Sequence, residues 1–149
     1  MESPIPLRVL ALHARKTNDS VSQDVAKSAA EIFLKRKIYK RQIDGSIIKD
    51  DLVKLHYPCY WHCEILFGLK ILAEADFTDE RCTDALDLLE SKQLSNSGFP
   101  AETKYYQVTT NVKRSGKPLV NWGGVSQNRM NEFVTVDALY VLKKAGRLS

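Results

Sequence analysis

The sequence lacks any run of about 18 apolar residues, which excludes a membrane-spanning helix. Its first ten residues, MESPIPLRVL, contain a glutamate and two prolines where a secretory leader needs an unbroken apolar segment. Cysteine is scarce, and the three that occur are an odd number, which does not suit a disulfide framework. These absences predict a cytoplasmic protein with free thiols.

Strong charge of either sign is also missing. The 149 residues carry a net charge of +4, with 44% hydrophobic and 27% charged residues, which is the composition of one globular domain spanning residues 1–149. This balance does not imply a nucleic-acid partner, and none is expected. The one dense cationic run, KRKIYKR at Lys35–Arg41, can contact phosphate or an anionic membrane surface. A solvated helix end stabilised by the helix dipole is the simpler interpretation.

Hydrophobic periodicity predicts an all-α chain. In the segment Ser20–Lys37, the residues Val25, Ala29 and Phe33 recur at a spacing of four and share one helical face. The other expected helices cover Leu7–Lys16, Pro58–Ala75, Arg81–Gln93 and Asn131–Ala145. The first of these looks like the end of a helix without its beginning. The polar stretch Leu94–Arg129 is long enough to have a function or some structure of its own.

The boundaries of these helices follow from local signals. Pro58 suits the first turn of a helix that is apolar on nearly all sides, and such a helix is usually buried on more than one side. Thr78 or Asp79 is expected to cap the helix that follows it. Gly146 occupies the position after the last helix where glycine is favoured.

The chain contains an internal repeat of helix, loop and helix. Ala30 matches Ala85 at an offset of 55 residues, and the apolar pattern around Leu69 matches that around Leu139 at an offset of 70. The difference between the offsets reflects a longer second loop. Repeats of about 50 residues built from helix pairs indicate a stacked helical array, either a solenoid or a ring.

The loops of this repeat carry a family resemblance. QIDGSI (Gln42–Ile47) and QLSNSGF (Gln93–Phe99) resemble worn copies of the Gln…Asp-Gly-x-Trp repeat of squalene and hopene cyclases. The segments HYPCYWHCEILFGLKIL and FVTVDALYVLKKAGR resemble bacterial proteins with prenyltransferase and squalene-oxidase repeats. Over roughly Leu7–Arg147, the chain resembles the terpenoid cyclase/protein prenyltransferase α/α toroid superfamily.

The resemblance implies a partial α/α toroid of repeated helical hairpins, in which inner helices line a hydrophobic cavity. The expected helices Pro58–Ala75 and Asn131–Ala145 would be inner, and those at Ser20–Lys37 and Arg81–Gln93 outer. A closed ring of such repeats needs on the order of 300 residues. The chain therefore resembles a C-terminal half, whose partner is either a missing toroid half or a second copy, and whose ligand is an apolar small molecule or isoprenoid.

Neither catalytic motif of the superfamily is present. The sequence has no Asp-x-Asp-Asp, the proton donor of the cyclases, and no Asp-x-Cys followed by a later histidine, the zinc set of the prenyltransferases. The resemblance thus implies the fold of the superfamily but not its catalytic activity. We expect no cofactor, no metal and no cyclase activity of the chain on its own, and whether it is an enzyme stays open. The alternative is a non-enzymatic helical-repeat module for protein interaction.

The segment LHYPCYWHCE admits three interpretations. Cys59, His62 and Cys63 are spaced to share one helical face, which permits a metal site, although structural zinc usually draws ligands from two elements. Cys59 near a helix start, three residues before His62, permits a reactive thiol. Because free cysteine is among the most buried residue types, an ordinary packed segment is the favoured interpretation.

In a toroid the same segment would lie at the mouth of an inner helix. Tyr60, Trp61 and His62, with Trp122 from NWGG, are the expected ligand-binding residues, because aromatic rings with few polar groups suit an apolar ligand. His62 and Glu64 are candidate catalytic residues as an acid and a base.

Two further features of the sequence leave alternatives open. Asp137, inside an apolar helix, is a third catalytic candidate, expected either to line the cavity or to bond a neighbouring loop. NWGG (Asn121–Gly124) forms either a rim lid or, as favoured, a packed turn.

Overall fold

The computed structural model describes residues 3–59, 63–108 and 119–148. In these ranges the chain is helical, and β-structure is limited to isolated bridges. The α-helices are α1 (Ile5–Thr17), α2 (Ser20–Lys35), α3 (Ile65–Glu74), α4 (Thr83–Glu90) and α5 (Glu132–Lys144), with short 3-10 turns at Asp50–Val53 and Glu80–Cys82. The predicted all-α class is confirmed.

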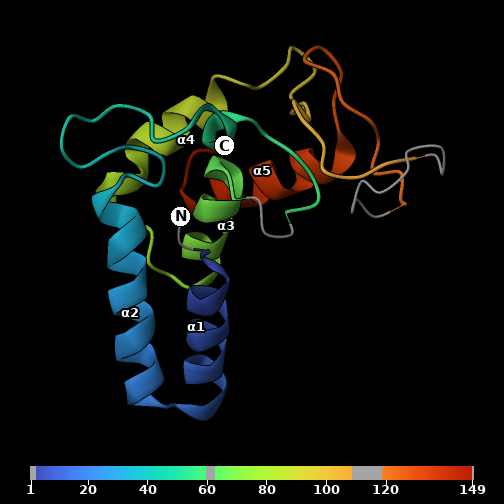
Figure 1. Cartoon of the computed structure of the whole chain (residues 1–149). Helices are drawn as coiled ribbons and strands as arrows, with labels where there is room; N and C mark the ends of the chain where they lie inside the picture. The colour runs from blue at the N-terminus through green and yellow to red at the C-terminus, as the bar shows by residue number, and fades with distance from the viewer. Residues whose placement is uncertain (1–2, 60–62, 109–118, 149) are drawn as a thin grey trace.

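Helices α1 and α2 form an antiparallel hairpin that extends away from the rest of the chain (Figure 1). Asn18 ends α1 in the left-handed region, with φ of 54°, and the Asp19 carboxylate then caps α2 by accepting from the backbone N–H groups of Val21 and Ser22. Helix α1 has 13 residues and its own start at Pro4. The expectation of an incomplete helix at Leu7–Lys16 was therefore wrong, because proline at the start hid the first turn.

Helix α3 is the centre of the hydrophobic core. Eight of its ten residues are buried, and it contacts α1, α4 and α5. Each fully buried Leu or Ile contributes roughly 1.5–3 kcal/mol relative to exposure, so this helix is a main source of stability. The predicted burial on more than one side is confirmed.

The start of α3 differs from the prediction by seven residues. The helix begins at Ile65, and Tyr57–Pro58 is a cis peptide outside it. Glu64 is the N-cap in extended conformation, with φ of −139° and ψ of 179°, and its carboxylate binds the first free N–H groups. The proline signal at Pro58 was thus misleading, and Cys59 and Cys63 do not share a helical face.

Helix α4 is shorter than the predicted Arg81–Gln93, because a 3-10 turn capped by Asp79 precedes it. Helix α5 begins after Asn131, whose side-chain oxygen accepts from the backbone N–H of Val134 at 3.1 Å, so its predicted boundaries hold to within one residue. Gly146, with φ of 69°, follows it in the left-handed region as predicted.

Helices α3 and α5 end in the same way. The backbone N–H of Phe77 donates to the carbonyl of Leu72, and that of Arg147 donates to the carbonyl of Leu142, both at 2.9 Å. Asp76 takes the left-handed φ of 57° that Gly146 takes in α5. The two closures are 70 residues apart, the offset found in the sequence.

The two glutamine-containing loops also share a local turn. The Asp44 carboxylate accepts from the backbone N–H of Ser46 at 3.0 Å, and the Asn96 side-chain oxygen accepts from that of Gly98 at 3.1 Å. Each is an Asx turn, in which the side chain binds the backbone two residues later. The Asp and Asn positions of the two motifs therefore have the same structural role.

Candidate functional site

The candidate site lies at the N-terminal end of α3, where Glu64 is only 2% exposed. One carboxylate oxygen accepts from the backbone N–H of Leu66 at 2.6 Å and the other from that of Phe67 at 2.9 Å. Glutamate is not among the usual N-cap residues. Here its longer side chain folds back onto the first turn, so the carboxyl group stays inside the protein.

Opposing effects act on the pKa of Glu64. The two backbone hydrogen bonds, together with the helix dipole, favour the charged form. Burial disfavours it more strongly and raises the pKa of Glu64 to about 8. Burial therefore favours the neutral carboxylic acid below that pH, at the start of an apolar helix.

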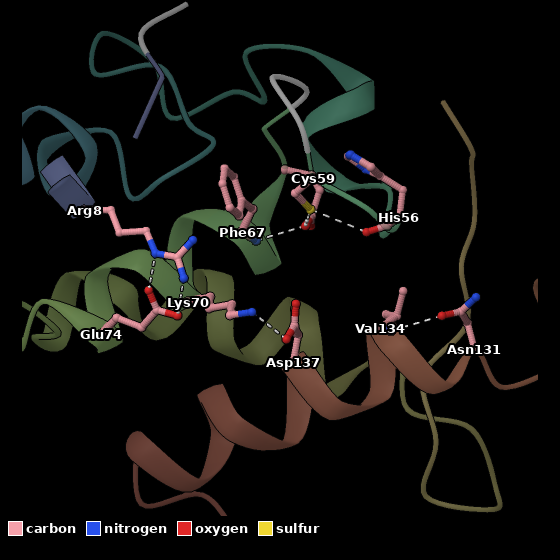
Figure 2. Close-up of polar contacts among 10 residues, drawn as sticks. Arg8, His56, Cys59, Phe67, Lys70, Glu74, Asn131, Val134 and Asp137 are labelled. Carbon is pink, nitrogen blue, oxygen red and sulfur yellow. Dashed lines mark hydrogen bonds and ion pairs between the residues drawn. The ribbon is translucent and has the colours of Figure 1, made fainter. Parts of the chain in front are cut away.

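Cys59 places a sulfur close to this acid. Its Sγ lies 3.6 Å from a Glu64 oxygen and 3.5 Å from the backbone carbonyl of His56, the second contact being drawn in Figure 2. Burial is the main cause that raises the pKa of the Cys59 thiol far above its ordinary value, and the ionised form of Glu64, which is present at higher pH, adds to the shift. The raised pKa does not support the reactive-thiol interpretation, since a nucleophilic thiol needs a lowered pKa.

The metal interpretation needs His62, which lies outside the described residues. All three cysteines lie in the described ranges outside any disulfide, and among the described residues no group of three His, Cys, Asp or Glu side chains is arranged to hold a metal. His56 is buried, and its ring lies edge-on to Tyr105 with centroids 4.8 Å apart. The favoured interpretation, ordinary packing, holds for Cys59 and Cys63, which both pack against the core.

Asp137 has a partner that the sequence analysis did not anticipate. Its carboxylate lies 2.7 Å from the Lys70 ammonium, so the pair joins α5 to α3 (Figure 2). The partner is on a helix, not a loop as expected. The signal was Lys70 itself, which is the one cation in ILFGLKILAE and needs an acid nearby. The charge of Asp137 also contributes to the raised pKa of Glu64.

Trp122 packs in a cluster of three aromatic rings beside the site. Its ring centroid lies 5.2 Å from that of Tyr57 and 5.1 Å from that of Phe133, edge-on in both cases, and Tyr57 stacks on Phe133 at 4.9 Å. Such contacts add about 0.5–1.5 kcal/mol each beyond burial. The favoured packed turn at NWGG is the arrangement found. The indole N–H of Trp122 is buried with no hydrogen-bond partner among the described residues.

The remaining predicted ligand-binding residues, Tyr60, Trp61 and His62, lie outside the described residues. The acid–base pairing of His62 with Glu64 therefore stays a prediction.

A small cavity adjoins Glu64. It has a volume of about 20 Å³ and is lined mainly by apolar side chains from the end of α2, the loop after it and the start of α3. Arg36 and Glu64 are its charged lining residues. The space suits about one water molecule, whereas pockets for organic ligands measure about 300–1,000 Å³. An isoprenoid bound near Glu64 therefore needs a surface that this cavity does not include.

Comparisons with known proteins found no relative of the chain. No family model, no curated protein and no solved structure matches the chain. Within the described ranges, none of the helices has the length and apolar character required to cross a bilayer.

Proposed function

We propose that the chain forms one wall of a binding site for an apolar small molecule, as part of an α/α toroid of the terpenoid cyclase/protein prenyltransferase type. The observation that carries this proposal is Glu64, a neutral acid buried at the start of an apolar helix. Burying an ionisable group costs free energy. A buried acid with a strongly shifted pKa is therefore a candidate for a functional role.

The helical arrangement supports the same assignment. In the proposed ring, α3 and α5 are inner helices and α2 and α4 outer ones. Eight of the ten residues of α3 are buried, whereas in α2 only Ala26, Ala30 and Leu34 are. The matching closures of α3 and α5 at a 70-residue offset support their equivalent places in a repeat.

Glu64 gives this wall one chemical capacity. A neutral carboxylic acid in apolar surroundings can donate a hydrogen bond, or a proton, to a ligand that reaches it. The sequence has no Asp-x-Asp-Asp motif, so we propose binding without cyclase activity. Because the cavity beside Glu64 is small, the rest of the site comes from a missing toroid half or a second copy.

The test is native mass spectrometry of the full chain, purified from cells and then titrated with farnesol, an apolar alcohol. We expect an adduct of lipid mass, on the chain or on a dimer, and about tenfold weaker farnesol binding after Glu64→Gln. Glu132→Gln, at an exposed glutamate that starts α5, is the matched control and should bind as the wild type does. A chain that binds farnesol in neither oligomeric state would contradict the proposal.

One observation favours the alternative, a module for protein interaction. Helix α1 buries Leu7, Ala11 and Ala14 on one face, yet on the opposite face Val9 is 60% exposed and Leu12 50% exposed. A second apolar face is a feature of helices that pack on two sides. Light scattering on Val9→Lys separates the readings: loss of a dimer with farnesol binding retained would favour an interaction module.

A further inference from the structure

A second site lies on the surface beyond the end of α2. A hollow of about 200 Å³ opens there, lined by Lys35, Lys37, Lys40, Arg41, Gln42 and Gly45. We call this feature the cationic hollow. Four of the five cations of the basic run KRKIYKR line this hollow. The proposed function gives that run no role. The run begins at the exposed end of α2, as the favoured interpretation has it, and continues past Lys35 into a structured turn.

One carboxylate holds two of these cations together. The ammonium groups of Lys37 and Lys40 lie 2.9 and 2.6 Å from the same oxygen of Asp84, on α4. The two nitrogens are therefore at most 5.5 Å apart, the sum of those distances. Each ammonium has three N–H donors, and Asp84 accepts one from each. The donors that remain can serve a second anion.

An unusual backbone turn holds this arrangement. Lys37 and Ile38 both have positive φ, 44° and 74°, although neither is glycine. A β-branched residue there is a genuine outlier and costs about 1–3 kcal/mol. The side chain of Ile38 is fixed against α3: a Cβ added to Gly68 would lie 2.7 Å from it. Tertiary packing thus maintains a turn that places Lys37 and Lys40 on Asp84.

The hollow has excess positive charge. Among the described residues, Lys35 and Arg41 have no carboxylate within ion-pair distance, and Glu31, the nearest acid to Lys35 along α2, is bound by Arg81. The hollow has four cations, and two carboxylates oppose them: Asp84, which binds Lys37 and Lys40, and Asp44, which is near Arg41. The net charge of this group is therefore +2. The C-terminal dipole of α2 contributes about −0.5 and does not cancel this excess.

We propose that the cationic hollow binds a phosphate-bearing anion. Two phosphate oxygens can bridge the free donors of Lys37 and Lys40, whose spacing is fixed by Asp84. Arg41 offers a planar pair of N–H groups, the geometry that suits phosphate oxygens. Lys35, the last residue of α2, adds a further positive charge to the hollow.

The first test is a titration of the isotopically labelled full chain with inorganic phosphate at constant ionic strength, followed by amide NMR shifts. We expect saturable shifts confined to residues 35–45. Lys35→Gln with Arg41→Gln should weaken binding at least tenfold, with little effect on folding, because neither side chain has an ion-pair partner in the part of the chain that the structure describes. Lys16→Gln with Lys27→Gln removes the same charge elsewhere on the hairpin and should leave binding unchanged.

For a second variant, Asp84→Asn, we expect stronger phosphate binding. Asp84→Asn removes the competing carboxylate while the side-chain oxygen remains an acceptor, so phosphate should bind about threefold more tightly or better. A purely structural role for the lysines predicts no gain. Shifts spread over all basic residues, equal losses in both double variants, or an unsaturable response would overturn the proposal.

The same chemistry can come from a free phosphate or a lipid headgroup. Co-sedimentation with vesicles of phosphatidylcholine containing phosphatidic acid distinguishes these sources. Binding to these vesicles that is lost in the Lys35/Arg41 double variant, and that free phosphate does not displace, would identify a headgroup site. Saturable phosphate binding without sedimentation would identify a soluble ligand. Failure of both measurements would overturn the proposal, and neither result bears on farnesol binding at Glu64.

Discussion

Two carboxyl groups in this protein have pKa shifts in opposite directions. Glu64 is buried at the start of α3, and desolvation raises its pKa to about 8 although two backbone N–H groups bind it. Asp84 lies partly exposed on α4, and its hydrogen bonds with Lys40 and then Lys37 lower its pKa. Hydrogen bonds alone therefore do not decide the charge of an acid. Solvent access and a nearby cation do.

The two regions are connected through one contact. Ile38, in the turn that positions Lys37 and Lys40, packs on Gly68 in the first half of α3. Ile38 also lines the small cavity beside Glu64. The buried acid and the cationic hollow thus lie on two sides of a single turn, and variants can separate them.

The largest effect should come from pH acting on Glu64. Its folded pKa of about 8 is above its ordinary value of 4.5, so the folded chain binds more protons between these pH values. The contribution of Glu64 to stability is then fully present below about pH 4.5 and is lost as pH rises to 8, by an amount on the order of 5 kcal/mol. Urea unfolding at a series of pH values measures this slope.

Glu64→Gln should remove that slope, because the amide does not titrate and its oxygen can still accept a backbone N–H. The variant should be more stable than the wild type at pH 8 and less stable, or equal, at pH 5. An unchanged pH dependence in Glu64→Gln would show that another group titrates.

The next effect tests the contact between the two regions. Gly68→Ala places a methyl group 2.7 Å from the Ile38 side chain, which the turn holds in place. Overpacking of this kind costs about 1–3 kcal/mol, in spite of the better helix propensity of alanine. Thermal unfolding should show the loss, and Gly68→Ala with Ile38→Val should recover part of it. Equal stability of Gly68→Ala and the wild type would mean that the turn is free to move.

A smaller effect is expected for the pair that joins the inner helices. Asp137→Asn leaves Lys70 without its carboxylate in a partly buried position and should cost about 1–2 kcal/mol. Asp24→Asn, on the exposed side of α2, is the control and should change stability by less than about 0.5 kcal/mol. Chemical unfolding of both variants measures the difference. Equal losses of stability in Asp137→Asn and Asp24→Asn would show that the Lys70–Asp137 pair does not stabilise the fold.

The smallest effect is expected at Asp84. Asp84→Asn should cost about 0.5–1 kcal/mol at pH 7, because exposed ion pairs contribute little. The folded pKa of Asp84 is lowered, so its contribution is present at neutral pH and is lost as pH falls through the acidic range. The wild type and Asp84→Asn should thus converge in stability at low pH, with the variant less stable at neutral pH, whereas Glu64→Gln should be more stable than the wild type at pH 8. A constant difference at every pH would contradict this.

The sequence predicted best where local signals decide structure. Helices α2 and α5 were found because their apolar periodicity is regular and each begins at a good cap, Asp19 or Asn131. The closure of α5 at Gly146 follows from the same local chemistry. Glu64 was singled out as a candidate acid, although its role as an N-cap was not.

The sequence predicted worst where distant contacts override local preference. The start of α3 was missed because Pro58 is a familiar helix starter and Glu64 an uncommon cap. The turn at Lys37 and Ile38 could not be foreseen, since only its packing on Gly68 makes positive φ tolerable for isoleucine. The pairing of Asp137 with Lys70, 67 residues away, likewise depends on the docking of α5 against α3.

The proposed site depends on Glu64 as a buried acid whose pKa is raised to about 8. The most direct measurement is the carboxyl ¹³C shift of Glu64 in the labelled full chain as a function of pH, assigned by its loss in Glu64→Gln. We predict that the carboxyl resonance of Glu64 titrates near pH 8, well above the ordinary glutamate value of 4.5. A Glu64 resonance that has already reached its ionised position at pH 6 would contradict the account and remove the acid from the proposed site.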